Sequence, residues 1–369
     1  MKLNKKLYPL RNDLEILQSN EDGQEIVIIA DRLGYSEHQI AVTLEFFWLL
    51  TQIGPFTSTN DLMSILGIED ASFLEPFLSE LDNLDNMLFL DSPNFYLEKK
   101  KYDEEFAKNP YRQSILDGYS HPSEPNEFEP YMDEIFSTSH VDSVISDASA
   151  IIVPHLDFVT GEQSFKAYSS SYHSIRNTDF DTVVIFGTAH FYASHRFMLS
   201  KKIFSSPAGD LHPDIELINE MISVAPNSFI IDEMAHKPEH SIEIQTTSLK
   251  HYFKNKEFKI LPVLVAGFFD FMDNNQNPSN DKIINDFIDS LNNSLKKLNR
   301  KPVFIASVDF SHYGKKFGDE FQAEEKIPEA IQSDKQLINE ILNLDADGFY
   351  SKIAENEDKW RVCGTAPIY

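Results

Sequence analysis

The sequence predicts a chain of two parts, a small α+β domain followed by a larger α/β domain with a largely parallel sheet and helices on both faces. Three observations lead to this fold class. The chain has 369 residues, which is more than one typical domain holds. Its later part alternates apolar, strand-like runs with segments of helical periodicity. Its earlier part instead places helices before a hairpin-like segment.

Residues 1–105 are expected to form the small domain. Its predicted elements are one strand and three helices, at residues 24–31, 36–54, 57–67 and 70–85. Residues 86–100 then indicate a β-hairpin with a Ser-Pro-Asn turn. Three helices followed by a hairpin is the order of a winged helix.

The charge balance argues against the DNA binding that a winged helix suggests. Residues 1–105 hold 8 Lys and Arg against 20 Asp and Glu, and the whole chain holds 32 against 59, a formal net charge of −27. A surface that binds phosphates needs the opposite sign. We therefore expect no binding to nucleic acid or to an anionic membrane, and a protein-contact or purely structural role for this domain.

Residues 106–145 are rich in proline, serine and acidic residues, which predicts a linker or arm. Residues 146–369 are expected to form the α/β domain. Its predicted strands are residues 148–155, 181–190, 228–232, 258–267 and 301–310. Its predicted helices are residues 163–176, 213–224, 239–253, 281–298 and 321–342.

Cysteine content and hydropathy predict a cytoplasmic location. The chain has one cysteine, Cys363, so it has no internal disulfide. The first residues turn polar too early for a signal peptide, and no apolar run approaches the roughly 20 residues of a membrane span.

Polar side chains follow three of the predicted strands at their carboxyl ends. His155, His190 and the pair Asp309 and His312 come directly after apolar runs. Ligands collect at this edge of a parallel sheet. Cys363 adds a thiol, and imidazole, carboxylate and thiolate together suit iron, copper or zinc.

Each of these residues also has an ordinary structural explanation. A histidine after a strand is often a hydrogen-bonded cap, Asp309 can accept backbone amides in a turn, and a single buried cysteine is often a small apolar filler. Capping explains Glu239 and His240, at the start of a predicted helix, as well as catalysis does. The coincidence at several strand ends favours a site. Gly187, in a predicted loop, is expected to help shape its pocket.

The serial motifs of the later part resemble those of the Memo family, called AmmeMemoRadiSam system protein B in prokaryotes. The motifs are, in order, VPHLDF, FGTAHF, SPAGDLHPD, EHSIEIQ, ILPVLVAG, SVDFSHYG and CGTAPIY. The opening LYPLRNDLEIL is similar to the PqqD-like winged-helix domain that precedes many bacterial members. Members continue past the last motif, so the resemblance implies that this chain lacks the family's C-terminal tail.

The resemblance implies a fold like that of the class III extradiol dioxygenases, which hold non-haem iron through histidine and carboxylate ligands. Matched residue by residue, it implies that His155, His190 and Cys363 are the metal ligands. Asp309 and His312 match the family's neighbouring acid–imidazole pair, and His240 matches the histidine of its EHSIE motif.

The function that follows is a mononuclear iron or copper site, with zinc less favoured, that performs redox or dioxygenase-like chemistry on a small molecule. Asp309 would orient an imidazole or join the ligands, and His240 or His312 would act as acid or base. Two alternatives stay open. One is a non-enzymatic protein that binds a peptide or partner and works with a radical-SAM enzyme and an AMMECR1-like protein, and the other is metal-dependent hydrolysis on zinc.

Overall fold

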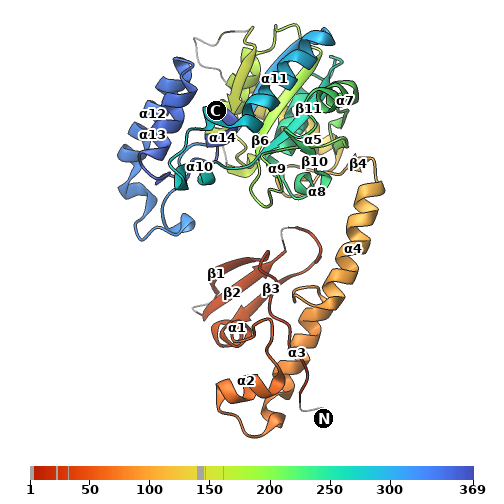
Figure 1. Cartoon of the computed structure of the whole chain (residues 1–369), viewed down its shortest axis with the longest axis vertical. Coiled ribbons are helices and arrows are strands. Elements are labelled where there is room, and N and C mark those ends of the chain that lie inside the picture. Colours follow the sequence, from red (N-terminus) through yellow and green to blue (C-terminus); the bar gives the residue numbers. More distant parts are fainter. Residues whose placement is uncertain (1–3, 22–23, 32, 139–144, 146, 161) are drawn as a thin grey trace. The chain divides into compact units, whose positions relative to one another are not determined.

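The computed structural model of the chain describes residues 4–21, 24–31, 33–138, 145, 147–160 and 162–369. The chain divides into two compact units, Met1–Asn109 and Pro110–Tyr369. Figure 1 labels many of the helices and strands of both units. Among the described residues, no helix combines the length and the apolar character needed to cross a bilayer.

The first unit packs helices against a three-stranded antiparallel sheet. The sheet has the order β1 (Glu15–Glu21), β2 (Gln24–Ala30) and β3 (Gln39–Thr43). The helices are α1 (Leu44–Thr51), α2 (Thr59–Leu66), α3 (Glu75–Asn86) and α4 (Pro93–Lys108). The core includes Val27 and Ile29 from the sheet and Leu50, Leu62 and Leu81 from the helices.

Two of the predicted elements of this unit are wrong. The first half of the helix predicted at residues 36–54 is β3, whose side chains alternate in exposure along Gln39–Thr43 as in a half-buried strand. The hairpin predicted at residues 86–100 is largely α4, because Ser92 caps this helix by accepting from the Phe95 amide and Pro93 occupies its first turn. The predicted order of three helices and a hairpin is therefore not found. The capped helix that ends at Gly67 is confirmed as α2.

The predicted linker or arm, residues 106–145, contributes instead to the second unit over most of its length. β4 (Tyr111–Arg112) pairs with β8 (Ile203–Ser206), which also pairs with β9 (Gly209–Leu211). α5 (Pro125–Ser137) buries Phe128, Met132 and Ile135 in the core. Residues 139–144, at the end of the predicted linker, lie outside the described residues.

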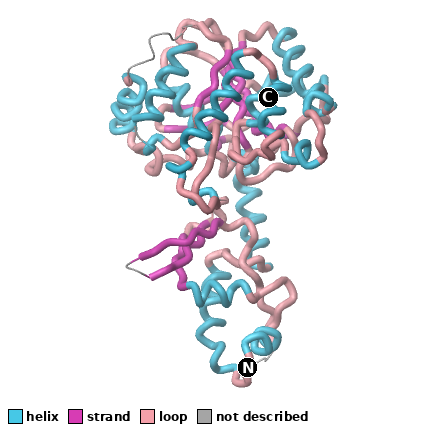
Figure 2. Tube along the Cα trace, turned by 90° about the vertical axis from the view of Figure 1, so that its left-hand side faces the viewer, coloured by secondary structure: helices cyan, strands magenta, loops and turns pink. Residues whose placement is uncertain are grey.

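The second unit has the predicted fold class, a largely parallel sheet with helices on both faces (Figure 2). The six strands have the order β10-β7-β11-β6-β12-β5. Their bounds are β5 (Ala150–Val153), β6 (Thr182–Thr188), β7 (Phe197–Leu199), β10 (Ile230–Ile231), β11 (Lys259–Val265) and β12 (Pro302–Ser307). β7, which the sequence does not predict, runs antiparallel to β11. β7 has only three residues, all of them buried, and so short a run shows no alternation of apolar and polar residues from which a strand could be predicted.

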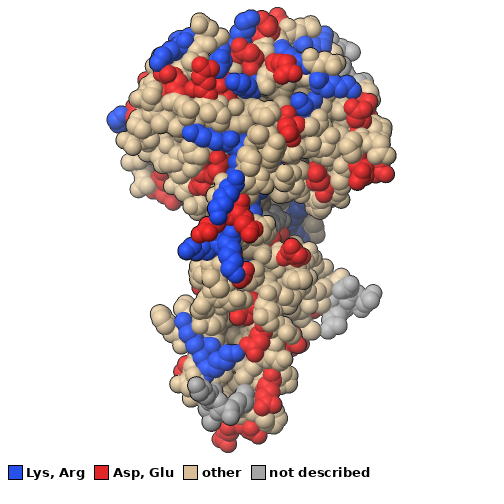
Figure 3. Space-filling model, turned by 90° about the vertical axis from the view of Figure 1, so that its right-hand side faces the viewer, with Lys and Arg blue, Asp and Glu red and all other residues tan. Residues whose placement is uncertain are grey.

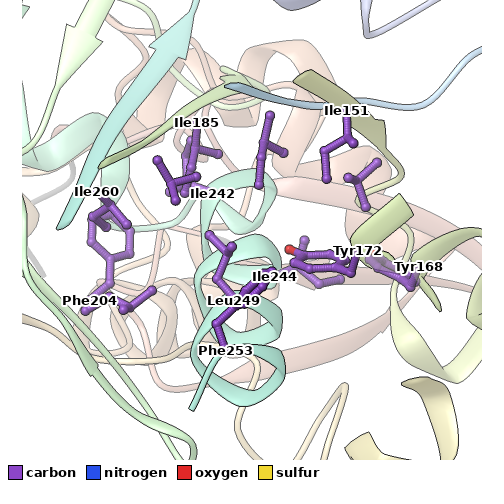
Figure 4. Close-up of a cluster of buried hydrophobic side chains, with 14 of the residues drawn as sticks. Ile151, Tyr168, Tyr172, Ile185, Phe204, Ile242, Ile244, Leu249, Phe253 and Ile260 are labelled. Carbon is purple, nitrogen blue, oxygen red and sulfur yellow. The ribbon is translucent and has the colours of Figure 1, made fainter. Parts of the chain in front are cut away.

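Alternate residues of the strands face two separate cores. Val183 and Ile185 of β6 face one core, which Figure 4 shows between the sheet and α9 (His240–Tyr252). α5 and α6 (Glu162–Ser174) cover the same face. Val184 faces the other core, under α7 (Ile215–Val224) and α11 (Lys282–Lys297). The remaining helices are α8 (Glu233–His236), α10 (Phe269–Asp273), α12 (Ile327–Leu342), α13 (Ala346–Ala354) and α14 (Thr365–Ile368).

An apolar groove of about 820 Å³ lies on the second face of the sheet. Its floor includes Ile152 of β5 and Phe304 and Ala306 of β12, and residues of α11, α12 and α14 also line it. At its rim the side chains of Leu342 and Leu344 are 78% and 92% exposed. Apolar surface of this kind is unusual over an inner strand of a parallel sheet, whose faces helices normally cover.

Candidate metal centre

Three adjacent strands deliver the predicted site residues to one edge of the sheet. β6, β12 and β5 are neighbours and run parallel. His155, His190 and Asp309 each stand two residues after the end of their strand. The same offset at three carboxyl ends places these side chains at the same height above the sheet, where ligands collect in α/β proteins.

His155, His190 and Cys363 converge. One ligand atom from each lies within 4.8 Å of the others. The Sγ of Cys363 is 3.4 Å from Nε2 of His155, and the imidazole centroids of His155 and His190 are 4.9 Å apart. The Cys363 backbone is fixed against the sheet, since its carbonyl accepts from the Thr188 hydroxyl at 3.0 Å. The structure therefore brings together the three residues that the motif resemblance names as metal ligands, although they lie far apart in the chain.

His155 is buried and presents Nε2 to the cluster. Its Nδ1 donates to the carbonyl of Ser307 at 2.9 Å, so the proton of the neutral ring is on Nδ1 and the lone pair is on Nε2. Burial, with help from the nearby imidazoles of His190 and His240, lowers the pKa of His155 to about 3. The ring is therefore neutral at neutral pH, which is the form that binds metal ions.

His190 is held by Glu239. Its Nδ1 contacts Oε1 of Glu239 at 2.9 Å, and its backbone amide donates to Oε2 at 2.8 Å. Burial acts to lower the pKa of His190, but hydrogen bonds to Cys363 and Glu239 outweigh it and raise the pKa to about 10. Burial acts to raise the pKa of Glu239, but His190 outweighs it and lowers the pKa to about 2. The cluster thus stabilises a positive charge next to Cys363, and a metal cation can supply that charge in place of a proton.

The predicted acid and base residues lie around these three. Oδ2 of Asp309 is 3.4 Å from Nε2 of His155, and burial raises the pKa of Asp309 although His312 opposes it. His240 stacks on His190 with ring centroids 5.0 Å apart. His312 bonds through Nδ1 to the Phe310 carbonyl at 2.8 Å, and its ring, Asp309 and Cys363 form a second group with ligand atoms within 4.8 Å.

Sequence reasoning assigned no site role to the residues that hold the imidazoles. Glu239 is both the N-cap of α9, bonded to the Ser241 amide at 3.0 Å, and the partner of His190. Gln245 and Ser307 support His155 from the other side. The one sequence signal for Glu239 was its position directly before His240 in EHSIEIQ, and helix capping explained that position equally well.

Gly187 lies inside β6, in agreement with the strand predicted at residues 181–190 and not with the loop expected around this glycine, and it is where the start of α9 comes close to the sheet. A Cβ at this position would lie 2.7 Å from Cδ1 of Ile242 and 2.7 Å from Oγ of Ser241. Only glycine allows this approach.

Gly187→Ala is expected to push the start of α9 away from β6, lowering the free energy of unfolding by about 1–3 kcal/mol, as overpacked cores do. Urea denaturation measures the loss. Gly54→Ala is the matched control, since the added Cβ would lie 3.7 Å from its nearest neighbour, Oγ1 of Thr57, and Gly54 does not have a positive φ. Equal midpoints for the two variants would contradict the close contact.

The geometry defines an α/β protein with a candidate His/Cys/Asp metal centre at the carboxyl edge of its sheet. The family described as Memo-like protein matches residues 112–369, which span nearly all of the second unit. The chain belongs to the Memo family.

Individual relatives carry the family's name. A MEMO1 family protein of Aquifex aeolicus is 27% identical over 339 residues, which cover 91% of this chain and 84% of that protein. A MEMO1 family protein of Thermoplasma volcanium is 28% identical over 264 residues, which cover 70% of this chain and 83% of that protein. A MEMO1 family protein of Methanosarcina mazei is 30% identical over 188 residues, which cover 51% of this chain and 60% of that protein.

Proposed function

We propose that the second unit binds one redox-active metal ion, iron or copper, through His155, His190 and Cys363, and that it carries out redox or dioxygenase-like chemistry on a small molecule. The observation that carries the proposal is the convergence of these three ligand atoms within 4.8 Å, from two strand ends and the segment before α14.

The spacing of the donors fits a metal ion of this kind. Metal–nitrogen bonds of about 2.0–2.1 Å and a metal–sulfur bond of about 2.3 Å at a tetrahedral angle separate the nitrogen and sulfur by about 3.6 Å. Nε2 of His155 and Sγ of Cys363 are 3.4 Å apart. Imidazole and thiolate together suit iron, copper and zinc. The fold like that of the extradiol dioxygenases, which the motif resemblance implies, supports the redox-active metals.

The neighbouring residues support acid–base chemistry beside the metal. A bound iron or copper ion would supply one-electron chemistry and activate oxygen or substrate. His240 keeps 32% of its side chain exposed, so it can exchange protons with solvent, and Glu239 lies 3.4 Å from its Nδ1. Asp309 is positioned to hold or release a proton close to His155. We assign acid and base roles to His240, His312 and Asp309.

Anaerobic equilibrium dialysis against Fe²⁺ or Cu⁺, followed by elemental analysis, tests the proposal. We expect about one ion per chain. With Co²⁺ as an optical probe, the wild type is expected to show a sulfur-to-metal charge-transfer band that Cys363→Ser lacks. A wild-type chain that binds neither ion, or a band that persists without the thiol, would contradict the site. Zn²⁺ bound in preference to both ions would contradict the redox assignment.

A further inference from the structure

Both metal-binding imidazoles are supported by side chains of one helical segment, the start of α9 with its N-cap. We propose that Glu239 and Gln245 are positioning residues, Glu239 for His190 and Gln245 for His155. This inference rests on the proposed function, because it takes the two imidazoles to be metal ligands.

Glu239 fixes His190 at two points. One carboxylate oxygen accepts from the ring Nδ1 at 2.9 Å and the other from the backbone amide at 2.8 Å, so both the ring and the loop after β6 are held. The carboxylate itself cannot swing away, since it is 1% exposed and also accepts from the Ser241 amide. With Nδ1 engaged, His190 offers Nε2 to a metal.

Gln245 fixes His155 indirectly, again at two points. Its fully buried amide donates to the carbonyl of Pro154, the residue before His155, at 2.8 Å. It also donates to the hydroxyl of Ser307 at 2.9 Å, and the carbonyl of Ser307 accepts a hydrogen bond from Nδ1 of His155. The Tyr172 hydroxyl donates to Oε1 of Gln245 at 2.8 Å, which sets the orientation of the amide.

The helix makes these two supports a single rigid part. The Ser307 hydroxyl also donates to the Ser241 carbonyl at 2.5 Å, and the Ser241 hydroxyl donates to the Thr188 carbonyl at 2.9 Å, so the first turn is bonded to both β12 and β6. A metal site requires its ligands to be held within about 0.5 Å of the productive geometry. The distance between the two imidazoles is therefore set by α9 as well as by the sheet.

Anaerobic titration of the full chain with Co²⁺ tests the inference, with affinity from competition and geometry from the d–d bands. We expect Glu239→Gln and Gln245→Met each to weaken Co²⁺ binding by about 10- to 100-fold and to alter the d–d spectrum. Thr246→Val is the matched control, because Thr246 is buried in the same helix and its hydroxyl bonds to the Glu243 carbonyl of that helix. It is expected to leave affinity and spectrum unchanged.

The outcomes separate this inference from the proposed function. If the wild-type chain binds Co²⁺, and Glu239→Gln and Gln245→Met both match Thr246→Val in affinity and spectrum, the positioning roles are overturned. The proposed metal site is then unaffected. A wild-type chain that does not bind Co²⁺ overturns both. Urea denaturation without metal checks that each variant folds. If Gln245→Met does not, Tyr172→Phe tests the same link, and a d–d spectrum identical to that of the wild type counts against it.

Discussion

Replacing His155 and His190 together by alanine is expected to abolish stoichiometric metal binding. The double variant keeps Cys363 but loses two of the three converging ligands. Structural zinc sites in peptides gain about 10–16 kcal/mol from a full ligand set, so losing two ligands costs several kcal/mol and weakens binding by at least about 1000-fold. Elemental analysis after anaerobic dialysis measures the ions retained per chain.

His212→Ala is the matched control for this double variant. His212 is exposed, and its carbonyl accepts from the amide of Ile260 near the amino end of β11, at the edge of the sheet opposite the site. The same histidine-to-alanine change there is expected to leave one ion per chain. Retention of a full equivalent by the double variant would show that the ion binds elsewhere.

Arg112→Met is expected to lower the free energy of unfolding of the second unit by about 3–5 kcal/mol. The guanidinium is buried and pairs with Glu243, whose side chain is 2% exposed. It also donates to the carbonyls of His236, Lys237 and Glu239. Without it, Glu243 keeps a buried charge with no cation, and these three carbonyls and that of Gln113 lose their donor.

Tryptophan fluorescence during urea denaturation measures this loss. The chain has two tryptophans, Trp48 in the first unit and Trp360 in the second, so a Trp48→Phe background reports on the second unit alone. Arg176→Met is the matched control, since this exposed arginine donates to the His173 carbonyl at the surface, and a change within about 0.5 kcal/mol is expected. Equal losses for the two variants would refute the role of the buried pair.

The sequence revealed the strand-end residues because their pattern is local. An apolar run followed by a polar ligand type can be read at β5, β6 and β12 without knowing the fold, and the parallel sheet then brings the three ends together. The capped helix α2 was predictable for the same reason, since its cap and its final glycine are neighbours of the apolar pattern.

Contacts between distant residues could not be read in this way. Arg112 and Glu243 are 131 positions apart, and arginine and glutamate are normally exposed, so neither stood out as a buried pair. Local ambiguity caused the other errors. Ser92 and Pro93 suit both a turn and a helix start, and packing of the unit decides between them. The count of charged residues also does not say where they lie on the surface. Figure 3 shows acidic and basic side chains interspersed over one face of the second unit.

The groove over β12 and β5 has a thermodynamic consequence. Phe304, Leu342 and Leu344 are already in contact with water in the folded chain, at least in part. Unfolding therefore hydrates less new hydrocarbon than it would with that surface covered. The heat-capacity increment of unfolding should therefore be slightly smaller than it would be with the groove covered, and the stability of the folded state should vary slightly less steeply with temperature.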